Sequence, residues 1–192
     1  MIKILNEAEI KNLLRVAAGN CTRDYTMIFL ALSTGLRCSE LIGLYIEDIA
    51  PFDGVATVLT VPERIAKRKI KRDIPLNHEI RTILTAWLKI KKSNRHPINP
   101  DSFLFTSHNT NKQLSPRDFQ RIVKRISTAV LGRSISPHTF RHTFATRVLK
   151  QSNTRVVQEL LGHARVQTTE IYTHPNSEDT RSAIDKSLIF EK

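Results

Sequence analysis

Helix-start signals recur along the chain, each directly before a run of apolar residues at helical spacing. The first is a capping-box pattern in which Asn6 stands three residues before Glu9. The later signals pair a capping side chain with a helical run, twice with proline at the first helical position: Asn77, Ser115-Pro116, Ser136-Pro137, and Asn153 or Thr154. Repeated capped, amphipathic segments predict a mostly helical domain.

The periodicity of the apolar residues changes between residues 55 and 76. Residues 55–61 are mainly β-branched or apolar and lie between Asp53-Gly54 and Pro62, and a second extended run ends at residues 73–76. Two such runs predict a small antiparallel sheet. A further short strand is expected at residues 103–105. The fold class is therefore α+β, mostly α-helical, with one small antiparallel β-sheet.

Basic residues are concentrated in two segments of the chain. The formal net charge is +12, which by itself suits a polyanionic partner such as nucleic acid and a merely solvated basic surface about equally. Residues 64–72 hold six Lys or Arg and no acidic residue, and residues 115–165 hold ten against Asp118 and Glu159. Because the excess lies within these segments, we expect a DNA-facing surface there rather than a general solubility charge.

Simple counts exclude several classes of protein. Two cysteines cannot build a disulfide framework or a zinc finger, so we expect Cys21 and Cys38 to be buried or free thiols. The sequence has no run of about 18 apolar residues that could span a membrane. Charge interrupts residues 1–10, where a signal peptide would need an apolar stretch. These counts predict a soluble, cytoplasmic protein without a membrane partner.

Two segments place basic side chains where a phosphate could meet them. Arg37 follows a helix that ends at Gly35, so the scaffold can hold it at a cleft; the alternative is a surface arginine paired with Glu40. His138 and Arg141 are three residues apart, so a helix puts both on one face. A guanidinium offers a bidentate fork to a phosphate, and an imidazole can donate a hydrogen bond or handle a proton.

Two further segments complete a recognisable series. They are LLGH at residues 160–163 and TTEIYTH at residues 168–174. In order and spacing, the four segments resemble the tyrosine recombinase (phage integrase) family over residues from about 5 to 175. The residues that carry the resemblance are Arg37 in TGLRCSEL, His138 and Arg141 in HTFR, His163 in LLGH, and Tyr172 nine residues later.

The resemblance implies a role for each of these residues. Tyr172 would attack a DNA phosphodiester, forming a 3′-phosphotyrosine and freeing a 5′-hydroxyl, and a second 5′-hydroxyl would reverse the step without ATP. Arg37 and Arg141 would clamp the non-bridging oxygens of the phosphate. His163 would hydrogen-bond the phosphate, and His138 would assist proton handling at the tyrosine. Fixed cations would stabilise the charge that develops in the transition state, so no cofactor is expected.

The family also uses a β-hairpin lysine as general acid for the leaving 5′-oxygen. Counting back from residues 74–76, Lys67 takes this place, but the residues on either side are not the usual glycines, so Lys69 remains a candidate. Glu40 matches a supporting acidic position and is expected to orient a neighbour. The other cations of this run are expected to be plain phosphate contacts: Arg64, Arg68, Lys69, Lys71 and Arg72.

A metal site is the less favoured interpretation of the histidines. His138 and His142 are four residues apart, but the general-base glutamate of the helical zinc motif is missing. The sequence also has no carboxylate cluster suited to Mg²⁺. Phosphate binding explains His138 better, so we expect no metal.

The resemblance also predicts the domain organisation and partners. Residues 1–176 are expected to form the catalytic domain, and residues 177–192 a tail that docks on a neighbouring protomer or folds back on its own domain. The chain begins close to the first catalytic-domain helix, so the core-binding domain of many relatives is expected to be absent, in a natural short form or a truncated fragment. Expected partners are double-stranded DNA, further copies in a tetramer on DNA, and accessory DNA-bending proteins. Such a protein would be nucleoid-associated, of bacterial or mobile-element origin.

Two alternative functions remain open at this point. One is a catalytically decayed or regulatory DNA-binding relative. The other is a type IB topoisomerase-like enzyme, which shares the chemistry but relaxes supercoils without a defined partner site.

Overall fold

The computed structural model describes residues 4–52, 54–66, 71–107, 110, 112–162, 181 and 184–185. Its elements are α1 (Glu7–Asn20), α2 (Thr22–Thr34), α3 (Cys38–Ile42), α4 (Ile46–Ile49), β1 (Val58–Val61), β2 (Arg72–Pro75), α5 (His78–Ser93), α6 (Pro116–Leu131), α7 (Pro137–Gln151) and α8 (Thr154–Leu161). The described chain is mostly helical with one two-stranded antiparallel sheet, which confirms the α+β class. No helix in this part of the chain is long and apolar enough to cross a membrane.

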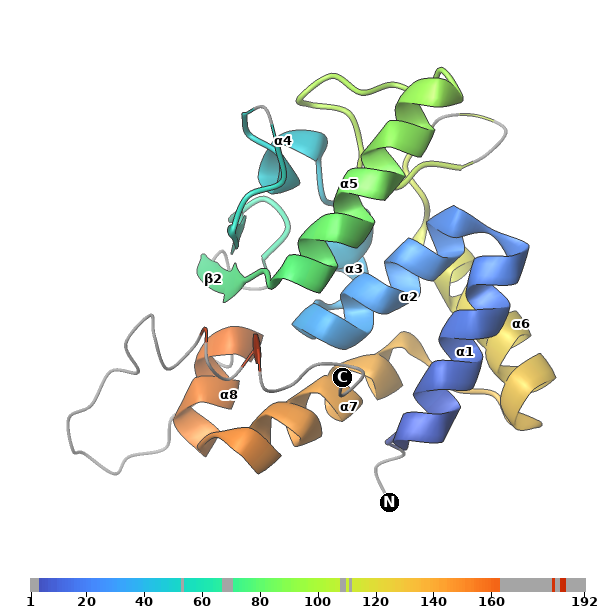
Figure 1. Cartoon of the computed structure of the whole chain (residues 1–192), viewed down its shortest axis with the longest axis vertical. Helices are drawn as coiled ribbons and strands as arrows, with labels where there is room; N and C mark the ends of the chain where they lie inside the picture. Colours follow the sequence, from blue (N-terminus) through green and yellow to red (C-terminus); the bar gives the residue numbers. More distant parts are fainter. Residues whose placement is uncertain are drawn as a thin grey trace.

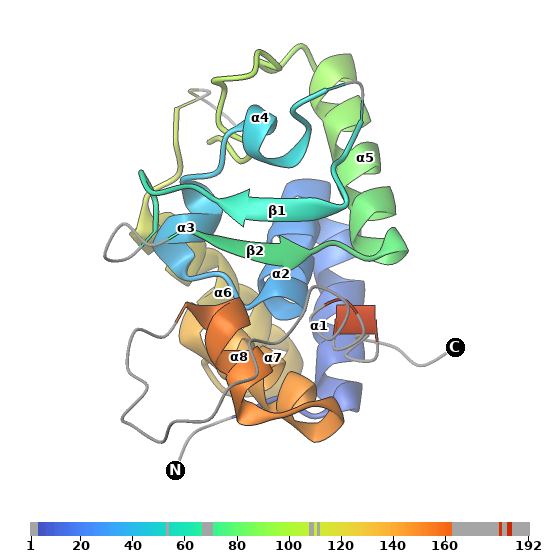
Figure 2. The same ribbon diagram turned by 90° about the vertical axis from the view of Figure 1, so that its left-hand side faces the viewer.

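Helix α2 lies at the centre of the helices and is buried along almost its whole length. It packs against α1, α5 and α7, and Figure 1 shows α5 above it and α7 below it. The sheet lies to one side, where β1 contacts α4 and β2 contacts α8 (Figure 2). This arrangement brings the C-terminal end of α2, strand β2, the middle of α7 and the end of α8 to one place.

The capping residues expected from the sequence start most of their helices. Asn6 accepts a bond from the backbone N–H of Glu9 at 2.9 Å, and the Glu9 carboxylate accepts one from the Asn6 N–H at 3.0 Å. The side chains of Asn77, Ser115 and Asn153 accept bonds from first-turn N–H groups of α5, α6 and α8. Ser136 precedes α7 without such a bond, so the start of α7 is set by Pro137 rather than by a capping side chain.

The extended segments are shorter than the sequence pattern predicts. β1 begins at Val58 rather than at residue 55, and it pairs with β2 in the register Val61 opposite Arg72. The strand expected at residues 103–105 does not form, and Phe103 makes only a single bridge with Tyr45. Leu104 is fully buried. Leu104 and Phe105 therefore fill the core, and although the Leu104 N–H donates to the Leu44 oxygen at 2.8 Å, the segment does not form a strand.

Gly35 ends α2 in the left-handed conformation, with φ of 63°. A Cβ atom at this position would lie 2.4 Å from Phe144 Cδ1 and 2.9 Å from Leu161 Cδ2. Both the backbone conformation and the close packing of α7 and α8 therefore require glycine.

We expect Gly35→Ala to lower the free energy of unfolding by about 3 kcal/mol, because the left-handed conformation and the overlap with Phe144 both cost stability. Gly132→Ala is the matched control: Gly132 ends α6 with the same φ of 63° but has open space around it. The control should lose only about 1 kcal/mol, the cost of the conformation alone. Urea denaturation measures both variants, and equal losses would contradict the packing argument.

Candidate active site

A fully buried carboxylate, that of Glu40 on α3, lies at the centre of the candidate site. Arg72 of β2 donates Nη1 to Oε1 at 3.1 Å and Nη2 to Oε2 at 2.7 Å. Arg37 donates Nη1 to Oε1 at 2.7 Å and its backbone N–H to Oε2 at 2.8 Å. Burial by itself would raise the pKa of Glu40, but the hydrogen bonds and charges of Arg72 and Arg37 outweigh it and lower the pKa. Glu40 is therefore an ionised carboxylate held by two arginines.

Arg141 reaches the same place from α7, and its side chain is also buried. It donates Nη1 to the carbonyl oxygen of Gly35 and Nη2 to that of Leu161, both at 2.6 Å. Burial, followed by the positive charge of Arg37, lowers the pKa of Arg141 to about 10. The guanidinium therefore stays charged at neutral pH.

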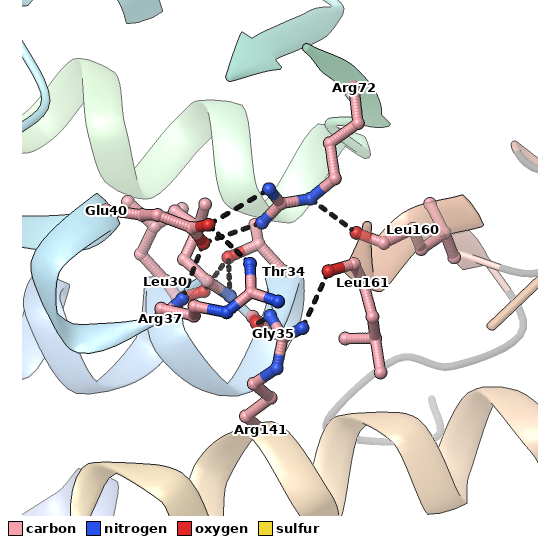
Figure 3. Close-up of polar contacts among 10 residues, drawn as sticks. Leu30, Thr34, Gly35, Arg37, Glu40, Arg72, Arg141, Leu160 and Leu161 are labelled. Carbon is pink, nitrogen blue, oxygen red and sulfur yellow. Dashed lines mark hydrogen bonds and ion pairs between the residues drawn. The ribbon is translucent and has the colours of Figure 1, made fainter. Parts of the chain in front are cut away.

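Three guanidinium groups thus gather near one carboxylate: those of Arg37 and Arg72 bond Glu40, and that of Arg141 lies beyond Arg37 (Figure 3). Arg72 is enclosed, whereas 18% of the Arg37 side chain is exposed to solvent. The cluster carries more positive than negative charge in a largely water-excluded place, where charges are weakly screened. An anion placed against Arg37 and Arg141 would relieve this repulsion and accept charge-assisted hydrogen bonds. The arrangement is therefore suited to bind a phosphate group.

The end of α8 is fixed by the same arginines. The last carbonyl groups of a helix have no partner within the helix, and here Arg72 Nε donates to the Leu160 oxygen at 2.8 Å while Arg141 donates to that of Leu161. Two positive charges at a helix C-terminus also complement the helix dipole. Gly162 follows in the left-handed conformation, with φ of 61°. The described end of α8 is therefore held by Arg72 and Arg141.

The structure brings four of the sequence-predicted residues together: Arg37, Glu40, Arg72 and Arg141. His138 lies on α7 one turn before Arg141, with its side chain exposed. Five other predicted residues lie outside the described residues: Lys67, Arg68, Lys69, His163 and Tyr172.

Arg72 is placed differently from the plain phosphate contact expected of it. Only 4% of its side chain is exposed, and its three guanidinium nitrogens are bonded to Glu40 and Leu160. Strand alternation could have indicated this, because Arg72 lies two residues before the fully buried Ile74 and so shares its face. In the sequence, this inward-facing cation is not distinguishable by residue type from the other cations of the run.

The other described cations of this run differ from each other. Arg64 forms an ion pair with Asp48, donates to the Gly43 oxygen at 2.6 Å and lies over the Tyr45 ring at 3.6 Å from its centroid. Lys71 is exposed and lies 3.8 Å from Glu63. Lys71 is thus open to a phosphate, whereas Arg64 would have to give up intramolecular contacts to reach one.

The described residues hold no group of three His, Cys, Asp or Glu side chains close enough to share a metal ion. His142 is exposed on α7. Cys21 and Cys38 are half-buried thiols, and burial raises the pKa of Cys38 to about 11, so this thiol is protonated at neutral pH.

We expect Glu40→Ala to lower the free energy of unfolding by about 3 to 5 kcal/mol, because it leaves Arg72 buried without its counter-charge. The control is Glu7→Ala, which removes the exposed ion pair with Lys11 and should change stability little. Since the pKa of Glu40 falls below its ordinary value of 4.5 on folding, its stabilisation is present above that pH and lost as the pH falls further. Denaturation of both variants and the wild type between pH 3 and pH 7 tests this, and a Glu40→Ala loss no larger than that of Glu7→Ala would refute it.

Comparison with known proteins agrees with the site. Residues 3–179 match the phage integrase family. Tyrosine recombinase XerA of Pyrococcus furiosus is 34% identical over 190 residues, which cover 98% of this chain and 63% of that protein. Tyrosine recombinase XerC of Azotobacter vinelandii is 37% identical over 166 residues, which cover 86% of this chain and 52% of that protein. The chain thus spans less than two thirds of the length of these relatives.

Solved structures give the same result. The crystal structure of XerA recombinase has a TM-score of 0.72 at 29% identity and covers 97% of this chain and 65% of that one. The Tn1549 transposon integrase in complex with circular intermediate DNA has a TM-score of 0.67 at 27% identity, covering 86% of this chain and 59% of that one. XerH recombinase bound to its palindromic difH substrate has a TM-score of 0.66 at 25% identity, covering 85% of this chain and 47% of that one. Since the family match extends over nearly the whole length, the chain belongs to the phage integrase family of tyrosine recombinases.

Proposed function

We propose that residues 1–176 form the catalytic domain of a site-specific DNA recombinase, which cleaves and rejoins strands through a 3′-phosphotyrosine intermediate. The observation that carries the proposal is the arginine cluster, in which Arg37, Arg72 and Arg141 outnumber the one carboxylate of Glu40. Such a cluster stabilises a phosphate most when negative charge grows on it, as in the pentacovalent transition state. The named relatives are recombinases, which favours this function over topoisomerase-like relaxation or a decayed relative.

The chemistry follows from the residues in the cluster and the motifs. The Tyr172 oxygen attacks phosphorus, and the bond from phosphorus to the 5′-oxygen breaks as the new ester forms. Arg37 and Arg141 hold the non-bridging oxygens, so charge develops against cations that are already in place. The proton leaves the tyrosine with the help of His138, and Lys67 or Lys69 supplies one to the leaving 5′-oxygen. Attack by another 5′-hydroxyl reverses these steps and releases Tyr172.

The proposed partner is double-stranded DNA. XerH and the Tn1549 integrase were both solved on DNA, the latter from a transposon, which supports a mobile-element origin. By family resemblance we also propose a tetramer on DNA, assisted by DNA-bending proteins, at the nucleoid. Ile184 in the tail is 1% exposed and belongs to the core of its own chain. Because Ile184 is buried in its own chain, we favour the alternative that residues 177–192 fold back on their own domain. Docking on a neighbouring protomer is the less favoured alternative.

A nicked suicide substrate tests the nucleophile. Substrates carrying successive fragments of the DNA around the gene are incubated with the protein, and a covalent adduct is sought after denaturing electrophoresis. We expect an adduct with the wild type and with the control Tyr25→Phe, and none with Tyr172→Phe, because only Tyr172 supplies the attacking oxygen. Absence of an adduct on every fragment would favour a decayed relative, and relaxation of arbitrary plasmids would favour a topoisomerase.

The phosphate clamp is tested by Arg141→Ala in the same assay. We expect the rate of adduct formation to fall by at least about 100-fold, as for other lost transition-state contacts. Arg15→Ala, an exposed arginine on α1 outside both basic segments, should retain the wild-type rate. A loss of less than about threefold for Arg141→Ala would remove Arg141 from the clamp, since such a change is below 1 kcal/mol.

A further inference from the structure

We propose that Arg72 is a positioning residue of the phosphate site, which holds Glu40 and the end of α8 so that Arg37 and Arg141 stay directed at the phosphate. The inference rests on the proposed function, because it assigns a role within that same site. It replaces the simpler idea that Arg72 is one more cation that touches the DNA backbone.

The first argument is the reach of one enclosed side chain. Arg72 joins β2 to α3 through Glu40 and to α8 through the Leu160 oxygen, partners that lie 32 and 88 residues away in the sequence. Its planar fork can satisfy these acceptors at once, as a lysine ammonium cannot. With 4% of the side chain exposed, Arg72 has little surface to offer to DNA.

The second argument is the charge of Glu40. With Arg72 in place, Glu40 has a bidentate partner and takes a single guanidinium bond from Arg37, through Nη1. Without Arg72, the buried carboxylate would have Arg37 as its nearest remaining counter-charge and would draw that guanidinium inward. The positive charge available to a phosphate would then fall, and Arg37 would turn away from its partly exposed position.

The third argument is the end of α8. The Arg72 side chain lies against Gly162, where a Cβ atom would stand 3.0 Å from Arg72 Cδ. Arg72 bonds the Leu160 oxygen, and Arg141 bonds that of the next residue, Leu161. Loss of Arg72 would therefore release the last turn of α8 and loosen an acceptor that orients Arg141.

Arg23 provides a matched control. Its side chain is nearly as buried as that of Arg72, at 8% exposure, and it likewise makes two bonds to a buried carboxylate, that of Asp24, and one to a backbone oxygen, that of Thr106. It lies at the start of α2, whereas the site lies at its end, about 18 Å away at the helical rise of 1.5 Å per residue. Arg23→Met therefore reproduces the loss of stability without touching the phosphate site.

The experiment compares Arg72→Met, Arg72→Lys and Arg23→Met with the wild type on the suicide substrate, at a temperature where each variant is folded. Single-turnover adduct formation is measured at saturating protein, and DNA affinity is measured over a range of salt concentrations. We expect both Arg72 variants to form the adduct at least about tenfold more slowly, as for a misplaced catalytic group. Their salt dependence of binding should match that of the wild type, and Arg23→Met should keep the wild-type rate.

Several outcomes would overturn the proposal. A wild-type rate for Arg72→Lys would mean that charge alone suffices, and a salt slope lowered by about 0.9 in either variant would mean a plain phosphate contact. An equal rate loss in Arg23→Met would mean general destabilisation. If Arg72→Met does not fold, the rate of adduct formation and the salt dependence of binding are compared for Arg72→Lys alone. Absence of an adduct with the wild type would instead count against the proposed function, so the two failures are distinguishable.

Discussion

The ion pair between Glu40 and Arg72 is the contact on which the rest of the site depends. A carboxylate as enclosed as Glu40 is tolerated only when its charge and lone pairs are met by partners. Arg72 meets both oxygens, and the same guanidinium continues to the end of α8. Arg72 thereby links strand β2 to helix α3 and to helix α8. Arg37 bonds Glu40 on α3, and Arg141 bonds the Leu161 oxygen at the end of α8, so both arginines are positioned by these linked elements.

Hydrogen bonds hold the arginine cluster together, although its three positive charges exceed the one negative charge of Glu40. Burial, and then repulsion from the positive charge of Arg37, lower the pKa of Arg141. Gly35 and Leu161 hold Arg141 in place through their carbonyl oxygens, so the repulsion does not push it aside. Keeping cations fixed before the substrate arrives costs stability but removes the need to reorganise them during the reaction. Under the proposed function, cations fixed in this way would stabilise the transition state of phosphoryl transfer more than the bound substrate.

Much of the fold was predictable because its signals are local. Asn6 and Ser115 cap helices through bonds to residues three positions later, and such bonds can be predicted from the residue types and their spacing. The prediction of a strand at residues 103–105 was wrong because apolar residues suit a strand and a core equally well. Only the residues that surround the segment in the folded chain decide between the two. The place of a residue at the candidate site was predictable where it stands in a motif with fixed spacing, as for Arg37 and Arg141, whose catalytic roles stay predictions. It was not predictable for Arg72, which stands in a run of cations whose members look alike.

By itself, the sequence determined the helices, the class of fold, the family resemblance and the identity of the residues suited to phosphate chemistry, because each depends on residue type and short spacing. Only the tertiary structure decided which of those residues meet and which cation turns inward. Glu40 and Arg72 are 32 residues apart, and Arg72 and Leu160 are 88 apart. No local preference encodes such pairs; they arise because packing encloses a charge, and an enclosed charge must find its partner wherever the fold supplies one.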